Sequence, residues 1–154
     1  MKVFIFSNAK GWKASHAKRL GIDKKDMLVF CNTALPSIYP PLSEHKNKCL
    51  YIRYDGDHNR YFKCLSGLRS FKKVFYICGP KDNIGIHTYE DYPDGFIPST
   101  GFILYRLLVG PAQTVLVNFL GPRPRQKLYM FHHWKFEKDI IDNDKRVTRM
   151  NTIK

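Results

Sequence analysis

Short apolar runs recur along the chain, and each ends at polar or turn-forming residues. Such runs are typical of strands, and apolar character without alternation is typical of strands that are covered on both faces. The pattern predicts strands over residues 2–6, 27–31, 48–53, 74–78 and 114–119.

The segments between these strands predict helices and two long loops. Residues 102–109 are so strongly apolar that we expect this helix to be buried almost all round. Three prolines predict a loop over residues 33–47, whereas residues 81–97 lack a clear period and have the length of a lid or binding loop. The predicted helices cover residues 13–20, 59–70, 102–109 and 134–141.

Strands that alternate with helices predict an α/β fold with a mostly parallel sheet and helices on both faces. We expect a single Rossmann-like domain over residues 1–141 and a frayed, polar and basic tail over residues 142–154. In such folds ligands bind beyond the carboxyl ends of the strands. A polar or turn-forming residue marks the end of each strand and predicts one crevice there: Asn8, Asn32, Asp55, Gly79 and Asn118.

The 154 residues carry a formal charge of +13, with a pI near 9.7. Such a surface favours phosphorylated substrates, acidic lipids or nucleic acid. The four cysteines include no CxxC pair, and three of them (Cys31, Cys49 and Cys78) lie at or in apolar runs, which favours free, buried thiols there and a reducing compartment without disulfides. No apolar run approaches the ~20 residues of a membrane span, and no signal-peptide pattern follows Met1. We therefore expect a soluble cytoplasmic protein, with peripheral contact with the inner face of the membrane as an additional expectation.

Residues 131–137 combine two histidines and a carboxylate directly after a basic loop, residues 121–127. Imidazole accepts or donates a proton near neutral pH, and Arg and Lys can hold a phosphate. The combination suggests group transfer from a phosphorylated donor, although paired histidines beside a helix are often only surface residues. The residues concerned are His132, His133 and Glu137, with Arg123, Arg125 and Lys127 in the loop.

Two turns have the chemistry of a nucleotide contact. Residues 7–11 form a strand-to-helix turn with small residues and an Asn, but they match neither GxGxxG nor the P-loop. Residues 98–101, Pro-Ser-Thr-Gly, place two hydroxyls at the start of a helix, which suits either an anion site or an N-cap. Asn32 suits either a sugar or base contact or a turn.

Two other interpretations stay open. Asp55-Gly56-Asp57 matches the DxD pattern by which metal-dependent transferases of nucleoside-diphosphate sugars hold a divalent cation, although three-residue motifs arise often by chance. The charge also allows a basic nucleic-acid-binding protein, in which aromatic residues that adjoin basic ones would stack bases. No helix-turn-helix, RNP-like or zinc-finger pattern accompanies the charge.

Taken in order, these segments resemble bacterial sialyltransferases. Residues 7–9 resemble the first nucleotide-binding turn of that family, and residues 30–32 resemble its second strand, which ends in a nucleotide-contacting Asn. Residues 98–101 resemble the segment that holds the cytidine monophosphate, and residues 115–117 resemble the strand after it. The likeness spans most of the chain.

The last family motif has the spacing His-x4-Glu, which His132 and Glu137 fit. By this resemblance His132 would be the general base, with His133 as the alternative, and Glu137 would orient or polarise the site. The resemblance implies a GT-A-variant-like fold and an inverting transfer of a sugar acid, either sialic acid or a Kdo-like sugar. The donor would be CMP-activated, and the acceptor would be a hydroxyl of a glycan or glycolipid.

The resemblance implies no metal and no cofactor, because the leaving group is a monophosphate whose charge is stabilised by hydroxyl or basic side chains. Nucleic acid is not an expected partner under this interpretation. The chain is much shorter than typical members, so acceptor contacts are either missing or supplied by a partner such as a second copy, and an inactive member also fits. The implied donor contacts are Ser7, Asn8, Asn32, Ser99, Thr100 and Gly101, and the implied leaving-group contacts are Arg123, Arg125, Lys127 and Tyr129.

Overall fold

The computed structural model describes residues 1–7, 13–31, 42–54, 73–78, 91–110, 113–119 and 132–150. These residues contain a six-stranded sheet in the order β4-β3-β2-β1-β5-β6, and each neighbouring pair is parallel. The strands are β1 (Lys2–Phe6), β2 (Met27–Cys31), β3 (Lys48–Tyr54), β4 (Lys73–Cys78), β5 (Gln113–Val117) and β6 (Val147–Met150). The described helices are α1 (Ala14–Arg19), the 3-10 helix η2 (Leu42–Glu44), α3 (Thr100–Leu108) and α4 (Trp134–Asn143).

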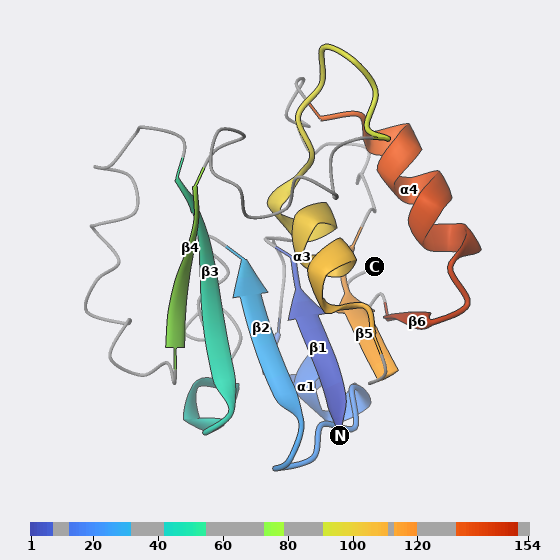
Figure 1. Cartoon of the computed structure of the whole chain (residues 1–154). Coiled ribbons are helices and arrows are strands. Elements are labelled where there is room, and N and C mark those ends of the chain that lie inside the picture. The colour runs from blue at the N-terminus through green and yellow to red at the C-terminus, as the bar shows by residue number, and fades with distance from the viewer. Residues whose placement is uncertain are drawn as a thin grey trace.

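The strand order reverses at the centre of the sheet. Strands β2, β3 and β4 follow one another on one side of β1, whereas β5 and β6 lie on its other side (Figure 1). The structure confirms the predicted α/β class and parallel sheet, and the five predicted strands are present with boundaries that differ by at most two residues. It adds β6 at the edge beside β5.

Successive side chains of a strand point to opposite faces, so β1 contributes to two separate apolar clusters. Phe4 and Phe6 lie in one cluster with Ala17 of α1, whereas Ile5 lies in the other with Phe102 of α3. α4 also contributes to the second cluster. Helices therefore cover both faces of the sheet, as the unbroken apolar character of the strands predicted.

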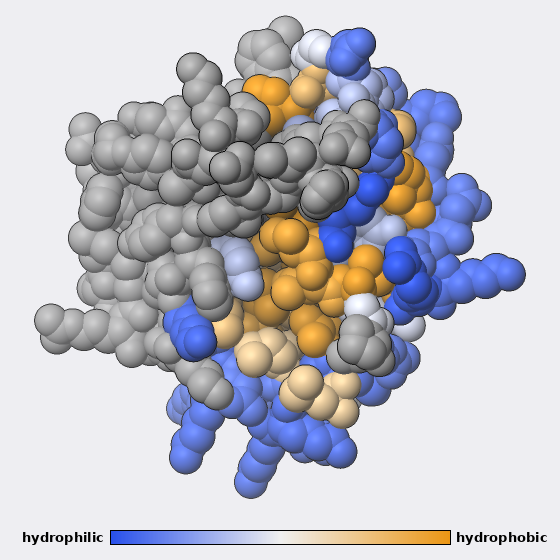
Figure 2. All heavy atoms as spheres, viewed as in Figure 1, coloured by the Kyte–Doolittle hydropathy of each residue, from blue (hydrophilic) through white to orange (hydrophobic). Residues whose placement is uncertain are grey.

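The helix that was expected to be buried almost all round is buried over its first half. Residues 102–105 are at most 2% exposed, but Leu107 is 43% exposed. Figure 2 shows apolar residues gathered at the centre of the face on which α3 lies. The expectation was therefore right for the half of α3 that packs into the second cluster and wrong for its last turn.

The expected frayed tail is wrong as far as Met150. α4 continues to Asn143, and Val147–Met150 pairs with β5. Val147 and Met150 pack against the two apolar clusters, and the Asn118 backbone N–H donates to the Met150 carbonyl oxygen. Four of the five charged side chains in residues 142–150 form ion pairs, Asp142 with Lys138 and Arg149 and Asp144 with Arg146, and these charges are compatible with strand formation.

Two cysteine predictions are confirmed, since Cys31 and Cys49 are free and buried. The predicted helix over residues 59–70 lies outside the described residues, as does Cys64. Within the part of the chain that the structure describes, no helix has the length and apolar character needed to cross a membrane.

Candidate functional site

The carboxyl edge of the sheet gathers several of the predicted site residues. Ser7 follows β1, Ser99 precedes α3, and His132 and His133 precede α4 (Figure 1). Glu137 lies in the first turn of α4. Other residues that were predicted to contribute lie outside the described residues: Asn8, Asn32, Asp55, Asp57, Gly79, Arg123, Arg125, Lys127 and Tyr129.

The carboxylate of Glu137 joins the starts of α3 and α4. Oε1 accepts a hydrogen bond from the Ser99 backbone N–H at 2.6 Å and another from the Tyr92 hydroxyl at 2.8 Å. Oε2 accepts one from the Ser99 hydroxyl at 2.6 Å. Glu137 is fully buried, and a buried carboxylate needs such donors. The N-terminus of α3 also favours negative charge, so Glu137 lies where a bound anion would otherwise be favoured.

Ser99 is the N-cap of α3. Its hydroxyl donates to Glu137 and accepts from the Phe102 backbone N–H at 3.1 Å. Its own backbone N–H also donates to Glu137. The capping alternative is therefore confirmed, and both Ser99 donors contact Glu137. A contact between Ser99 or buried Thr100 and a nucleotide stays a prediction.

Gly101 lies against the ring of Phe119, which follows β5. A Cβ atom on Gly101 would lie 2.7 Å from Cε1 of Phe119, closer than real Cβ atoms approach their neighbours. The missing side chain therefore lets α3 pack closely against the end of β5. This packing is a structural explanation for glycine at position 101. The contact between Gly101 and a sugar donor stays a prediction.

Tyr92 belongs to the site, although the sequence pattern did not single it out. Its hydroxyl donates to Glu137 and accepts from the His133 backbone N–H at 3.0 Å. Its ring meets that of Phe136 edge-on, with centroids 5.1 Å apart. Tyr92 thus fixes the end of the predicted lid segment to the start of α4. An aromatic residue before Pro93 in an aperiodic loop was the available signal.

His132 is held by the segment that leads into α3. Its Nδ1 lies 2.5 Å from the Ile97 carbonyl oxygen. A carbonyl oxygen only accepts, so Nδ1 carries the proton, and in the neutral ring the lone pair is on Nε2. The ring lies edge-on to Trp134, with centroids 5.0 Å apart, and is partly exposed. His132 therefore has the tautomer of a general base that acts through Nε2.

His133 has the opposite tautomer. Its Nδ1 accepts from the Phe136 backbone N–H at 3.1 Å and so caps α4. A backbone N–H only donates, so Nδ1 holds the lone pair and Nε2 carries the proton in the neutral ring. The ring also meets Phe96 edge-on at 4.8 Å between centroids. The proton-accepting nitrogen of His133 therefore serves the helix, and the choice between His132 and His133 as the base stays a prediction.

Ser7 lies where the strand order reverses between β1 and β5. Its hydroxyl donates to the Asn118 carbonyl oxygen at 2.6 Å, and its backbone N–H donates to the Val117 carbonyl oxygen at 3.2 Å. Asn118 has a φ of 58°, a left-handed conformation that Asn tolerates better than most residues. Open parallel sheets bind ligands at this position, and here Ser7 links the two strand ends.

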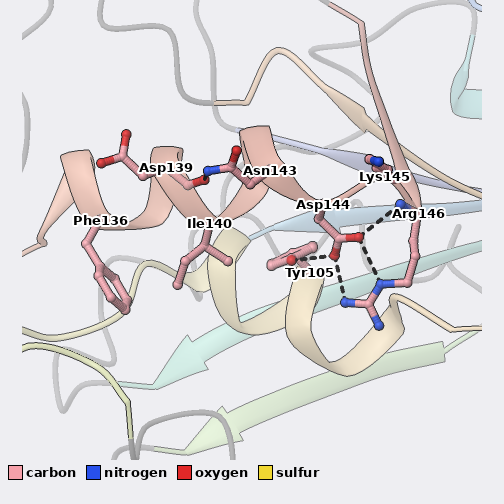
Figure 3. A pocket seen from close by; sticks show the side chains of 8 residues that line it. All are labelled: Tyr105, Phe136, Asp139, Ile140, Asn143, Asp144, Lys145 and Arg146. Carbon is pink, nitrogen blue, oxygen red and sulfur yellow. Dashed lines mark hydrogen bonds and ion pairs between the residues drawn. The ribbon is translucent and has the colours of Figure 1, made fainter.

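A hollow of about 750 Å³ lies between α3 and α4, and Figure 3 shows Phe136 and Ile140 on α4 with Tyr105 on α3. The Tyr105 hydroxyl donates to Asp144 at 2.6 Å, and Asp144 also accepts two hydrogen bonds from the Arg146 guanidinium. Burial, reinforced by Asp144, raises the pKa of Tyr105 to about 12. The hydrogen bonds from Arg146 and Tyr105 lower the pKa of Asp144 against the effect of burial. The described residues that line this hollow include none of the predicted site residues.

No protein-family model, no curated protein and no solved structure matches this chain. The geometry of the carboxyl edge is therefore the basis for its chemistry. That geometry provides a partly exposed imidazole whose basic nitrogen is Nε2, held by a loop that is itself bonded to α4. Such a group suits the removal of a proton from a hydroxyl or a water molecule.

Proposed function

We propose that this chain is a Rossmann-like, metal-independent transferase that moves a sugar acid from a CMP-activated donor to a glycan hydroxyl. The observation that carries the proposal is the hydrogen bond from His132 Nδ1 to Ile97, which leaves Nε2 as the proton acceptor at the carboxyl edge of a parallel sheet. The order of the Pro-Ser-Thr-Gly and His-x4-Glu segments supports the same chemistry. We place the proposed activity in the cytoplasm, either in solution or at the inner face of the membrane.

In this reaction His132 Nε2 removes the proton of the acceptor hydroxyl as its oxygen attacks the anomeric carbon. The bond between that carbon and the phosphate oxygen breaks, CMP leaves with the electron pair, and the configuration inverts. The proton then passes from His132 to solvent. Proton removal by a positioned base contributes about 10²–10⁴-fold to the rate of such steps.

In the proposed site Glu137 is a positioning residue. Its carboxylate accepts three hydrogen bonds inside the protein, and it is fully buried, so it holds the loop that carries Ile97 and does not attack the sugar. The charge of the departing CMP would be stabilised by the basic loop, as the sequence predicts for Arg123, Arg125, Lys127 and Tyr129.

The test compares donor binding with donor turnover in two variants of His132. CMP binding is measured by thermal stabilisation, and turnover by the release of CMP from CMP-sialic acid and CMP-Kdo. His132→Asn keeps a donor that can reach the Ile97 carbonyl oxygen but lacks the basic nitrogen, so binding is retained while turnover falls at least about 100-fold. His132→Gln, with its amide one carbon further from the backbone, also lacks the basic nitrogen, and its turnover falls in the same way. His45→Gln, at the other edge of the sheet, is the matched control and leaves turnover unchanged.

Absence of CMP binding by the wild-type chain would overturn the proposal. Turnover that survives in His132→Asn would remove His132 from the role of base. Turnover that EDTA abolishes would instead support the metal-dependent alternative with Asp55 and Asp57. Tight, salt-sensitive binding of RNA or DNA without CMP binding would support the nucleic-acid alternative.

A further inference from the structure

A groove lined by lysines and apolar residues lies at the amino edge of the sheet, opposite His132 and His133. This groove of about 490 Å³ is bordered by α1, by the turn between α1 and β2, and by η2 with the residues that follow it. Three lysines and three apolar residues line most of its described part: Lys18, Lys24 and Lys46, with Ala17, Ile22 and Leu42.

The lysines make the rim of this groove positive. Lys18, Lys24 and Lys46 are all exposed, and none of them forms an ion pair with a carboxylate in the described part of the chain. Glu44 is the one carboxylate among the described lining residues. An ammonium group is a compact point charge with three donors, and such groups bind phosphate oxygens. The rim therefore has the composition of an anion site.

The floor of the groove is apolar and continuous with the core. Ala17 and Leu42 are buried members of the cluster on the α1 face of the sheet, and Ile22 packs against that cluster while remaining partly exposed. An apolar group that enters the groove would cover Ile22 and gain free energy from its removal from water. A bare inorganic anion would leave this surface uncovered.

The backbone around the groove is held in place by hydrogen bonds between its two sides. His45 Nε2 donates to the Asp26 carbonyl oxygen at 2.8 Å, and the Asn47 amide donates to the Lys24 carbonyl oxygen at 3.2 Å. The buried Asp26 carboxylate accepts from the backbone N–H groups of Lys2 and Asp23 at 2.7 and 2.9 Å. A framework that is fixed before binding lowers the entropic cost of ordering the lysines around a ligand.

We infer that this groove binds a phosphate monoester that carries a small apolar body. The lysine rim matches the phosphate, the floor matches the apolar body, and the volume lies within the ~300–1,000 Å³ of ordinary ligand pockets. The site is separate from the carboxyl edge, so the inference does not depend on the proposed transferase activity.

The test measures binding of hexyl phosphate, inorganic phosphate and hexanol to the full chain by calorimetry. We expect hexyl phosphate to bind at least about tenfold more tightly than either of the other two, because only it meets both the rim and the floor. The double variant Lys18→Gln/Lys46→Gln weakens hexyl phosphate binding about tenfold. Ile22→Ser reduces the difference between hexyl phosphate and inorganic phosphate.

The matched control is Lys135→Gln/Lys138→Gln, which removes two charges from α4 and leaves binding unchanged. All substituted side chains are exposed or partly exposed, and thermal unfolding verifies that each variant folds. Equal binding of hexyl phosphate and inorganic phosphate, or equal loss in both double variants, would overturn the inference. Binding to vesicles that contain phosphatidic acid without binding of hexyl phosphate would overturn it in favour of a lipid surface.

Discussion

Glu137 and Ser99 are 38 positions apart in the sequence, yet the carboxylate of Glu137 accepts both hydrogen-bond donors of Ser99 at 2.6 Å each. This pair fixes the first turn of α4 to the N-cap of α3. The segment that precedes Ser99 also carries Ile97, whose carbonyl oxygen orients His132. The buried carboxylate and the partly exposed imidazole are therefore parts of one arrangement.

Ser99→Ala tests the structural side of this pair. The substitution removes the cap of α3 and one donor to a buried carboxylate, so we expect the free energy of unfolding to fall by about 2–4 kcal/mol. Urea unfolding near neutral pH measures the change. Ser15→Ala, at an exposed position in α1, is the control and changes stability by less than about 0.5 kcal/mol. A change in stability as small as that of Ser15→Ala would contradict the conclusion that the Ser99–Glu137 hydrogen bonds stabilise the fold.

Tyr92→Phe tests the link between the loop and α4. The ring can still pack against Phe136, but the His133 N–H and the Glu137 carboxylate each lose a partner. We expect a loss of about 1–3 kcal/mol in stability. Amide hydrogen exchange measured by NMR provides a local readout. Exchange at the His133 amide should accelerate more than exchange in the centre of β1, which changes only as far as the global stability changes. Unchanged protection of the His133 amide would show that the Tyr92 hydroxyl does not hold it.

The strands were predictable because each is a short apolar run, and such runs indicate burial whatever their partners are. Strand β6 was not, because Val147–Met150 contains two polar residues and is stabilised by pairing with β5, about thirty positions earlier. The His-x4-Glu spacing identified Glu137, but not its burial or its bond to Tyr92, which depend on the folded chain. The tautomers of His132 and His133 depend on Ile97 and on a helix N–H, and no sequence pattern encodes them.

Gly101→Ala tests the close approach of α3 to the end of β5. The new methyl group would press against the Phe119 ring, and overpacking of this kind outweighs the better helix propensity of Ala, for a net loss of about 1–2 kcal/mol. Gly110→Ala is the matched control, since a Cβ there would have 3.8 Å to its nearest neighbour. In a Phe119→Leu background, Gly101→Ala should reduce the free energy of unfolding by less than it does in the wild-type background. Additive effects of the two substitutions would contradict the contact.

Cys31 provides a test of burial at the end of β2. Burial raises the pKa of the Cys31 thiol to about 12, so almost no reactive thiolate is present near neutral pH. We expect iodoacetamide to leave Cys31 unmodified in the native protein and to modify it after unfolding in guanidinium chloride. Mass spectrometry of the peptide that contains Cys31 measures both states. Rapid modification in the native protein would show that this end of the strand is open to solvent.

The hydrogen bonds that Asp144 accepts from Arg146 and Tyr105, together with the burial of Tyr105, predict how stability depends on pH. The folded pKa of Asp144 lies below the ordinary value of ~3.9, so its contribution is present above that value and is lost as the pH falls. The folded pKa of Tyr105, about 12, lies above its ordinary value, so its contribution is present below pH ~10 and is lost as the pH rises through 12.

Asp144→Asn is therefore expected to destabilise the protein near neutral pH. The difference from wild type should shrink as the pH falls below ~4, because the unfolded wild-type carboxyl then takes up a proton while the folded one is still ionised. Tyr105→Phe keeps the ring in the core and loses the hydrogen bond, at a cost of about 1–2 kcal/mol that disappears at strongly alkaline pH. Urea unfolding over the pH range measures both effects. Asp139→Asn, whose exposed ion pair with Lys135 contributes little, is the control. A difference between Asp144→Asn and wild type that stays constant down to acid pH would show that the charge of Asp144 does not stabilise the fold.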